Sequence, residues 1–464
     1  MSISSTGVGS GLDVKGIVTQ LVAIEKQPLQ QLQSKANTIK TQLSLYGTVK
    51  SQVSALGDAA AKLAGATGWN VQKGSSSNTA AVTVTAASSA KSAALSVEVQ
   101  QLARAQTSAS AGVAAGTAAG ASGSLSIELG VWTGAAFASG GASVAVAIGA
   151  SDTLSDIAGK INAAGAGVAA TILKDGSTER LVMRSTSTGA AAGFRVNSPA
   201  DPGLSSLGLS NPSDGANFVG QTALDAKLTV NGVAVSSASN KIADVTPGVT
   251  LQLSQVTAAP VDVVVENDLD AVQKNIQSFV DAYNAVNQTL SDATKYTAAT
   301  KTGGPLQGDS VTLGLQTALR AILGSTSTGS TFSYLSDVGI ERQTDGSLKI
   351  NSTKLADAKL DLNNLKNLFT ADNGDAKTNG FAVKVQSFSK ALVAFDGAIT
   401  NKSSALQASI KRNSDDQDRV NDRAARVEVQ LYKQYTALDA QMAQLNGLSS
   451  FVTAQLAIWN KPGN

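Results

Sequence analysis

The sequence contains neither cysteine nor histidine. This absence excludes thiol nucleophiles, thiolate and imidazole metal sites, and histidine-based catalytic triads. It also leaves no disulfide to stabilise the fold. An enzyme would have to rely on carboxylates, lysines and hydroxyl groups, so the composition disfavours catalysis without excluding it.

Other features are scarce as well. Aromatic residues make up only 4% of the chain, which leaves few rings that could stack on bases or sugars. The net charge is +2 with both signs interspersed, so no basic field attracts nucleic acid. The longest uncharged stretches, residues 105–127 and 129–151, are too rich in Gly, Ser and Thr to span a membrane. We therefore expect no nucleic-acid partner and no membrane partner.

The first residues lack the basic and apolar regions of a cleaved secretory signal. We therefore expect a protein that is either cytosolic or exported by a route without a cleaved signal. The opening glycines Gly7, Gly9 and Gly11 do not form a phosphate-binding loop, because no strand precedes them and no Gly-Lys-Ser/Thr follows. Ser10 to Asp13 fits a short capping box at the start of a helix.

Both ends of the chain show helical periodicity. Apolar residues recur every three or four positions in residues 12–63 and again in residues 420–459. Pro28 interrupts the first pattern and should kink the helix or begin a second one. The second pattern covers about 40 residues, or roughly 60 Å of helix. So long an apolar stripe needs a partner helix, and we expect the N-terminal segment to supply it.

The middle of the chain instead shows the two-residue alternation of β-strands. Strands are predicted over residues 80–87, 93–102, 249–256 and 261–268. Asn231-Gly232 between two β-prone triplets predicts a type I′ hairpin. Residues 123–218 contain further strand candidates and a helix candidate at 153–163, which we interpret as a small inserted α+β domain.

The pattern is helical again after residue 268. The segment 269–290 carries apolar residues on one face, and the segment 306–324 follows it. Asp345-Gly346 predicts a second hairpin. From residue 381 onward the chain reads as helix up to the terminal stripe.

The fold class is therefore α+β. N- and C-terminal helices form a coiled-coil or helical-bundle leg, and two β-rich domains are inserted between them. We predict four divisions. Residues 1–40 are a flexible terminal helical segment that pairs with residues 430–464, and residues 41–70 with 266–429 form a helical leg domain with a small hairpin. Residues 71–116 with 222–265 form a β-rich domain, and residues 117–221 form an inserted variable α+β domain.

The charged segment 411–428 is rich in aspartate but does not match a calcium loop, because it lacks the required glycine and arginines interleave. We expect a solvated helix surface on which Asp415 pairs with Arg419, and Asp422 with Arg426, at i,i+4 spacing. Residues 372–380 are expected to form a plain turn. No catalytic, cofactor-binding or metal-ligating residue is predicted.

Residues 7–32, GVGSGLDVKGIVTQLVAIEKQPLQQL, resemble the N-terminal signature of the FliD-type flagellar filament cap family, hook-associated protein 2. The likeness rests on Gly-Ser-Gly-Leu-Asp, an Ile-Val-x-Gln-Leu helix and Glu-x-x-Pro-Leu. Residues 438–456 are similar to the closing helix of the family, and residues 268–287 and 306–310 to its C-terminal half. The resemblance covers both ends and most of the chain after Leu228, whereas the inserted unit carries no matching motif.

The resemblance implies a protein that leaves the cell unfolded through the flagellar type III export channel, with an export chaperone as a partner. It implies a ring-like homo-oligomer, five-fold or similar, outside the cell at the filament tip. There it would retain exported flagellin and promote its folding and polymerisation. The resemblance thus implies several partners: copies of the same chain, flagellin, the export machinery and, for the outer domains, a host surface.

The resemblance also implies that the helical legs contact filament subunits. The interface residues expected on this basis are Leu12, Asp13, Ile17, Leu21, Leu438, Leu445, Leu448, Phe451, Val452, Leu456 and Trp459. The alternatives that stay open are another flagellar axial protein (flagellin or hook–filament junction type), a secreted coiled-coil adhesin and a wall-hydrolysing enzyme.

Overall fold

The computed structural model describes residues 13–197 and 204–459. The chain divides into two compact units. The described residues of Met1–Trp69 and Gln273–Asn464 form the first, which we call the helical unit, and those of Asn70–Val272 form the second, the β unit. Long helices at both ends and a β-rich middle confirm the predicted α+β class.

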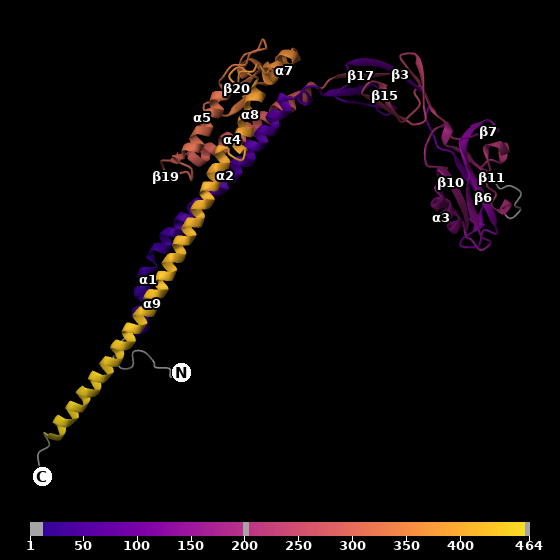
Figure 1. Ribbon diagram of the computed structural model, residues 1–464. Helices are drawn as coiled ribbons and strands as arrows, with labels where there is room; N and C mark the ends of the chain where they lie inside the picture. The colour runs from indigo at the N-terminus through magenta and orange to yellow at the C-terminus, as the bar shows by residue number, and fades with distance from the viewer. Residues whose placement is uncertain (1–12, 198–203, 460–464) are drawn as a thin grey trace. The chain divides into compact units, whose positions relative to one another are not determined.

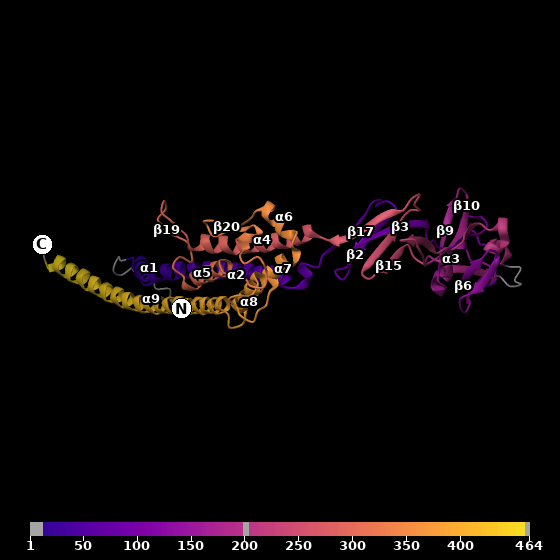
Figure 2. The ribbon, with the colours of Figure 1, turned by 90° about the horizontal axis from the view of Figure 1, so that it is seen from above.

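The helical unit is built around two long helices, α2 and α9, that lie side by side (Figures 1 and 2). Its helices are α1 (Val14–Glu25), α2 (Gln27–Ala64), α4 (Leu269–Thr294, which begins at the end of the β unit), α5 (Ser310–Leu323), α6 (Ser352–Lys359), α7 (Leu362–Thr370), α8 (Phe381–Val393) and α9 (Ala398–Trp459), with 3₁₀ turns η1 (Ala66–Gly68) and η5 (Leu335–Val338). Its two small hairpins pair β18 (Tyr296–Thr297) with β19 (Thr302–Gly303), and β20 (Ile340–Arg342) with β21 (Leu348–Ile350).

Pro28 begins a new helix rather than kinking a continuous one. Helix α1 ends at Glu25, and Pro28 lies in the first turn of α2, where its missing N–H costs no hydrogen bond. At the other end of α1, the Asp13 carboxylate accepts a 2.8 Å hydrogen bond from the Gly16 N–H. Asp13 is thus the N-cap itself, so the capping box that gave this role to Ser10 is wrong; Ser10 lies outside the described residues.

The core of the helical unit is aromatic at the end of α2. The ring of Phe369 on α7 lies 5.5 Å from Trp69 and 6.3 Å from Phe279 of α4, the second pair edge to face. All three side chains are fully buried. The six residues that the periodicity of α4 predicts for its core face are also buried: Val272, Ile276, Phe279, Val280, Tyr283 and Val286.

The helical character predicted from residue 381 onward is confirmed except at residues 394–397, which divide the segment into α8 and α9. A side chain at Gly397 would collide with the last carbonyl oxygens of α8. Asn401 then donates a 2.8 Å hydrogen bond to the Asp396 carbonyl and fixes the start of α9. The turn that results leaves Phe395 96% exposed.

The first part of the β unit consists of two sheets that pack on one another. The larger has the order β1 (Gln72–Ser76), β17 (Val261–Asn267), β3 (Ala93–Gln101), β13 (Ala226–Val230) and β14 (Val233–Ser237); the smaller has the order β15 (Lys241–Thr246), β16 (Val249–Leu253) and β2 (Val82–Ala86). Their alternating apolar residues share one core. Asn231 and Gly232 between β13 and β14 have φ values of 50° and 80°, which confirms the type I′ turn.

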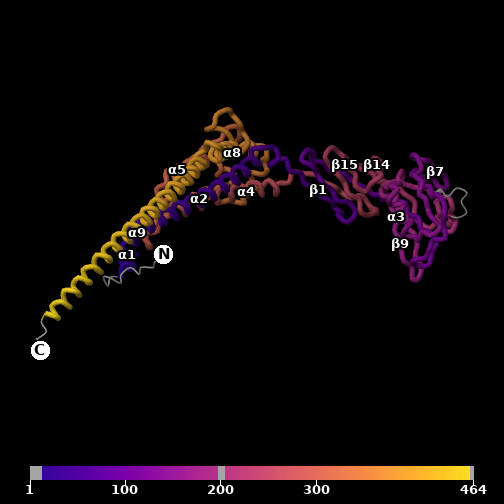
Figure 3. The backbone as a smooth tube through the Cα atoms, turned by 60° about the horizontal axis from the view of Figure 1, so that its bottom comes forward, coloured from indigo at the N-terminus to yellow at the C-terminus, as the bar shows by residue number. Residues whose placement is uncertain are grey.

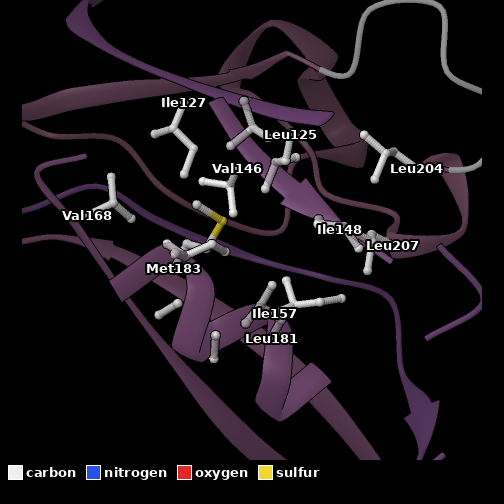
Figure 4. Close-up of a cluster of buried hydrophobic side chains, with 14 of the residues drawn as sticks. Leu125, Ile127, Val146, Ile148, Ile157, Val168, Leu181, Met183, Leu204 and Leu207 are labelled. Carbon is white, nitrogen blue, oxygen red and sulfur yellow. The ribbon is translucent and has the colours of Figure 1, made fainter. Parts of the chain in front are cut away.

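The second part of the β unit has its own core, shown in Figure 4, where Met183 and Val146 lie among leucines and isoleucines. One sheet contains β12 (Gly220–Gln221), β4 (Thr107–Ala109), β10 (Thr178–Ser185), β5 (Val113–Ala114) and β9 (Val168–Asp175); the other contains β11 (Gly193–Asn197), β6 (Gly123–Thr133), β7 (Ala136–Ser139) and β8 (Val144–Ile148). Helix α3 (Leu154–Ala164) and the 3₁₀ turns η2 (Ala190–Ala192), η3 (Ser205–Leu207) and η4 (Pro212–Asn217) complete it. The helix predicted at 153–163 is thus α3, capped by Thr153.

Strands β4 and β5 differ from the sequence-based division. Both lie in residues 71–116, which the sequence analysis places in the first β-rich domain, yet both pair with β10 of the inserted part. Strands of two or three residues are too short to show alternation, so the sequence carries no signal for them.

A candidate assembly surface on the long helices

Helix α9 is 62 residues long, and its first half is held by the rest of the helical unit. Ile399, Leu406, Asn413 and Ala424 are its buried residues. Helix α1 lies along it, with Val14, Val18 and Val22 packed on Ala424 and on the partly buried Leu431, Tyr432 and Tyr435. In Figures 1 and 3, α9 runs on beyond α1 without a neighbouring helix.

A partly buried polar cluster fixes the start of α9. Asp309, the N-cap of α5, accepts hydrogen bonds from the Tyr46 hydroxyl of α2 and from the Lys402 ammonium of α9. It also accepts 3.0 Å hydrogen bonds from the N–H and the hydroxyl of Thr312. Three elements that are distant in sequence therefore meet at one carboxylate.

The electrostatics of this cluster follow from its contacts. Burial raises the pKa of Asp309, but the hydrogen bonds that it accepts, with Lys402 the strongest, outweigh burial and lower the pKa to about 2. Burial, and then the hydrogen bond to Asp309, raise the pKa of Tyr46. At neutral pH the cluster is therefore a carboxylate that accepts from a lysine and a neutral tyrosine, which holds one end of α9 firmly on α2 and α5.

The other end of α9 is uncovered. We call residues 436–459 the distal segment; from residue 443 to 459 every residue in it is exposed. Leu445 is 59% exposed and Trp459 is 86% exposed. Contiguous exposed apolar residues of this kind mark a surface for another protein.

The distal segment is apolar on more than one side. It has no charged residue after Asp439. At about 100° per residue, Phe451 lies about 140° round the helix from Leu456. A helix that packs on one neighbour needs an apolar stripe of only about 100°. The distal segment is thus suited to burial among several helices at once.

The structure places the predicted interface residues as follows. Leu12 lies outside the described residues; Asp13 caps α1, Ile17 is partly buried, and Leu21 is exposed. The seven predicted residues of α9 are all exposed in the distal segment: Leu438, Leu445, Leu448, Phe451, Val452, Leu456 and Trp459. Helix α1 packs on Ala424 and on Leu431, Tyr432 and Tyr435 of α9, so these contacts reach only the beginning of the range 430–464 that the sequence analysis pairs with it.

Sequence reasoning missed the row of α1 that faces inward. The sequence analysis names Ile17 and Leu21 on this helix, yet Val14, Val18 and Val22 are the residues packed on α9, while Leu21 and Ile24 remain exposed. Both rows repeat at three- or four-residue spacing, so periodicity alone cannot choose between them. Consequently α1 also presents apolar side chains to a neighbour.

The predicted i,i+4 ion pairs of α9 are wrong. Arg419 pairs with Asp416, three residues earlier on the same helix. Arg423 donates from Nε to the Glu25 carboxylate of α1 at 3.0 Å and ties the two helices together. Within the described ranges, Arg426 forms no ion pair.

No feature of the described residues points to metal chemistry, since no three of their Asp and Glu side chains cluster closely enough to hold an ion. The aspartate-rich loop 372–380 is closed by its own contacts, in which the Asn373 amide donates to the carbonyl oxygens of Thr328 and Thr378. Over residues 13–197 and 204–459, no helix has the length and hydropathy that crossing a bilayer requires.

A helix clamped at one end and uncovered at the other defines a class: a structural protein that works by assembling with other subunits. Comparison with known proteins identifies the family. The model of the flagellar hook-associated protein 2 C-terminus matches residues 223–447, and that of its N-terminus matches residues 10–106. A flagellin hook IN motif matches residues 136–187, inside the unit for which the sequence analysis finds no motif.

Comparison with full-length relatives agrees with the match to the family models. The chain is 31% identical to flagellar hook-associated protein 2 of Escherichia coli K12 and 30% identical to the A-type protein of Pseudomonas aeruginosa, with 98% of each chain covered in both comparisons. Among solved structures, the D1-D2-D3 domains of the flagellar cap protein FliD from E. coli have a TM-score of 0.60 at 29% identity, covering 78% of this chain and 99% of that chain.

The chain belongs to the flagellar hook-associated protein 2 family. It is a flagellar filament cap protein, and its place is outside the cell at the filament tip. This membership confirms the resemblance seen in the sequence and decides against the flagellin, junction-protein and adhesin alternatives. The family is one of structural proteins.

The uncovered distal segment should differ from the rest of α9 in hydrogen exchange. In the monomeric protein we expect backbone amides of residues 438–459 to exchange far faster than those of residues 399–424, because helix without tertiary contacts frays and opens locally. In assembled caps the same amides should become protected. Strong protection of residues 438–459 in the monomer would contradict an uncovered segment; peptides from α4 provide the internal reference.

Proposed function

We propose that this chain forms a homo-oligomeric ring at the filament tip and stands on the filament through its helical legs. The β unit would build the plate of the cap. The distal segment, with the exposed row of α1, would contact flagellin subunits. In that position the cap retains exported flagellin and assists its folding and polymerisation.

One observation carries the proposal: the distal segment has no charged residue after Asp439, and its large apolar side chains from Leu438 to Trp459 are exposed. Burial of each of its large apolar side chains is worth up to about 1.5–3 kcal/mol, from which the cost of ordering is subtracted. Several legs binding at once hold the cap in place, while a single leg can release because the others keep the local concentration high. That combination suits a cap that must move as subunits are added beneath it.

The same surface explains the export partners that we propose. An apolar helix without a cover favours aggregation until it is buried, so a chaperone in the cytoplasm would occupy the distal segment before export. The chain would then travel through the flagellar export machinery unfolded. Adhesion of the outer domains to a host surface stays a prediction.

A pair of variants tests the role of the distal segment. Leu445→Asp with Val452→Asp places two charges in the apolar stripe, whereas Ala443→Asp with Ser450→Asp places two charges, at the same seven-residue spacing, on the opposite side of the helix. Neither pair touches the core of the folded monomer, because all four residues are exposed. Both proteins should therefore fold like the unmodified chain.

The readout is filament growth in a strain that lacks the gene. The deletion strain should secrete monomeric flagellin into the medium, and the unmodified chain and the Ala443/Ser450 variant should restore filaments. The Leu445/Val452 variant should leave flagellin in the medium. Full-length filaments in the deletion strain would refute the cap function, and normal filaments with the Leu445/Val452 variant would refute the role of the distal segment.

A further inference from the structure

Helix α9 carries two rows of opposite charge between its clamped start and its distal segment. Asp415, Asp418 and Asp422 follow one another at three- and four-residue spacing and form what we call the acidic row. All three side chains are exposed, and within the described ranges none of them forms an ion pair. Arg419 and Arg423, also exposed, repeat at four-residue spacing on the adjacent flank of the helix.

The two arginines line an open groove of ≈ 550 Å³ between α2 and α9. Leu32 and Val420 supply apolar lining, Lys35 of α2 adds a third cation, and Asp416, the ion-pair partner of Arg419, also lines the groove. We call Arg419, Arg423 and Lys35 the basic groove. Each arginine binds one carboxylate through a single nitrogen, Nη2 in Arg419 and Nε in Arg423. A guanidinium has five N–H donors, so most of them remain available for another carboxylate.

This arrangement of charge is unfavourable for the isolated helix. Asp418 with Asp422, and Arg419 with Arg423, are like-charge pairs at i,i+4, which destabilise a helix by themselves. Each row becomes favourable when opposite charges of another molecule face it. Asp415 and Asp422 lie within ion-pairing spacing of Arg419 on the same helix, yet Arg419 pairs with Asp416 instead, which leaves the acidic row of the described helix available to another molecule.

We propose that the acidic row of one copy docks in the basic groove of the next copy around the cap ring. This contact rests on the ring assembly proposed above. A ring requires two different, complementary surfaces on each subunit, and cyclic symmetry keeps both at the same height along the ring axis. Asp418 and Asp422 precede Arg419 and Arg423 by one residue, which is about 1.5 Å along the helix and about 100° around it. Parallel neighbouring legs therefore bring the rows face to face.

The contact sets register and orientation rather than supplying most of the affinity. Charge pairs near solvent are screened by salt, so the contribution of the rows should weaken as ionic strength rises. Their complementarity selects parallel legs whose acidic row faces the basic groove, and it rejects legs rotated so that two acidic rows or two sets of cations face each other, which would bring like charges together. The occupant of the groove is thus a second copy of this chain.

Charge reversal tests the proposal. The first variant reverses the acidic row (Asp415→Lys, Asp418→Lys, Asp422→Lys), and the second reverses the basic groove (Lys35→Glu, Arg419→Glu, Arg423→Glu). The third combines all six substitutions and so restores complementarity between copies. A matched control, Lys40→Glu with Lys50→Glu, alters exposed charges of α2 outside the groove. Circular dichroism verifies that each full-length protein folds.

Sedimentation velocity at low and high salt gives the dissociation constant of the oligomer. We expect each single-row variant to raise the dissociation constant about tenfold or more at low salt and the control to leave it unchanged. The variant with all six substitutions should return it to within about threefold of the value for the unmodified chain. The differences should shrink at high salt.

Four results would overturn the contact. Single-row variants that assemble like the unmodified chain, or a swap that does not recover assembly, would refute it while leaving the ring intact. Single-row variants that assemble normally but no longer co-sediment with flagellin filaments would assign the rows to flagellin instead. An unmodified chain that stays monomeric would refute the ring, and this contact with it.

Discussion

Phe369→Ala is expected to lower the free energy of unfolding of the helical unit by about 3–5 kcal/mol. The Phe369 ring is fully buried between Trp69 at 5.5 Å and Phe279 at 6.3 Å, and it joins α7 to α4 and to the end of α2. Its truncation loses the burial of a large apolar side chain. It also leaves a cavity, because two aromatic neighbours fixed in a dense core relax only in part.

The chain offers a matched control of the same residue type. Phe395 is 96% exposed in the turn between α8 and α9, so Phe395→Ala should change stability by less than about 0.5 kcal/mol. Urea unfolding followed by helical circular dichroism gives both values, provided that the slope with denaturant is unchanged. Equal effects of the two substitutions would mean that the aromatic cluster does not form the core of this unit.

Asp309→Asn should remove an acid-sensitive contribution to stability. The pKa of Asp309 in the folded protein is about 2, below the value of about 3.9 for an unfolded aspartate. A depressed pKa means that the contribution is fully present above pH 4 and is lost as the pH falls through 4 toward 2. With allowance for solvent screening, the contribution amounts to roughly 1–2 kcal/mol.

The prediction has two parts that urea unfolding between pH 2 and pH 7 can separate. At pH 7 the Asp309→Asn protein should be less stable than the unmodified chain, although asparagine still caps α5. As the pH falls toward 2 the two proteins should converge. Asp281→Asn, on the exposed side of α4, is the control and should follow the unmodified chain throughout. A stability difference that is constant with pH would refute the role of the Asp309 charge.

Much of this fold is predictable because local chemistry decides it. The apolar spacing of α4 predicts its buried face, Asn231-Gly232 predicts the hairpin of β13 and β14, and Pro28 predicts a kink or a new helix at the point where α2 begins. Each of these features is set by residues that are neighbours in sequence. Their conformational preferences point the same way as the tertiary contacts, so the two agree.

Other features depend on contacts that a single sequence does not show. The choice between the two rows of α1 is made by α9, which packs on Val14, Val18 and Val22 rather than on Leu21. Strands β4 and β5 exist because β10 is there to pair with them. The break before α9 follows from how closely Gly397 lies to α8. In all three cases a distant segment settles a local choice.

The candidate site divides in the same way. The apolar residues of the distal segment are visible in the sequence, because they recur at helical spacing with no charged residue among them after Asp439. The polar cluster is not visible, since Tyr46 and Asp309 are 263 positions apart. The sequence does indicate one part of the cluster, the role of Asp309 as an N-cap, because Asp309 directly precedes the helical segment that begins at Ser310. That signal gives no indication of the lysine that α9 contributes.

The two ends of helix α9 therefore have different roles. Substitutions of its buried residues before about residue 435 alter how firmly the molecule holds itself together, whereas those in the distal segment leave melting unchanged and alter only what the molecule can join. A laboratory strain that loses motility through a change near Leu445 should still yield soluble, well-folded protein, which makes this tip a place where affinity can be tuned without any penalty in folding.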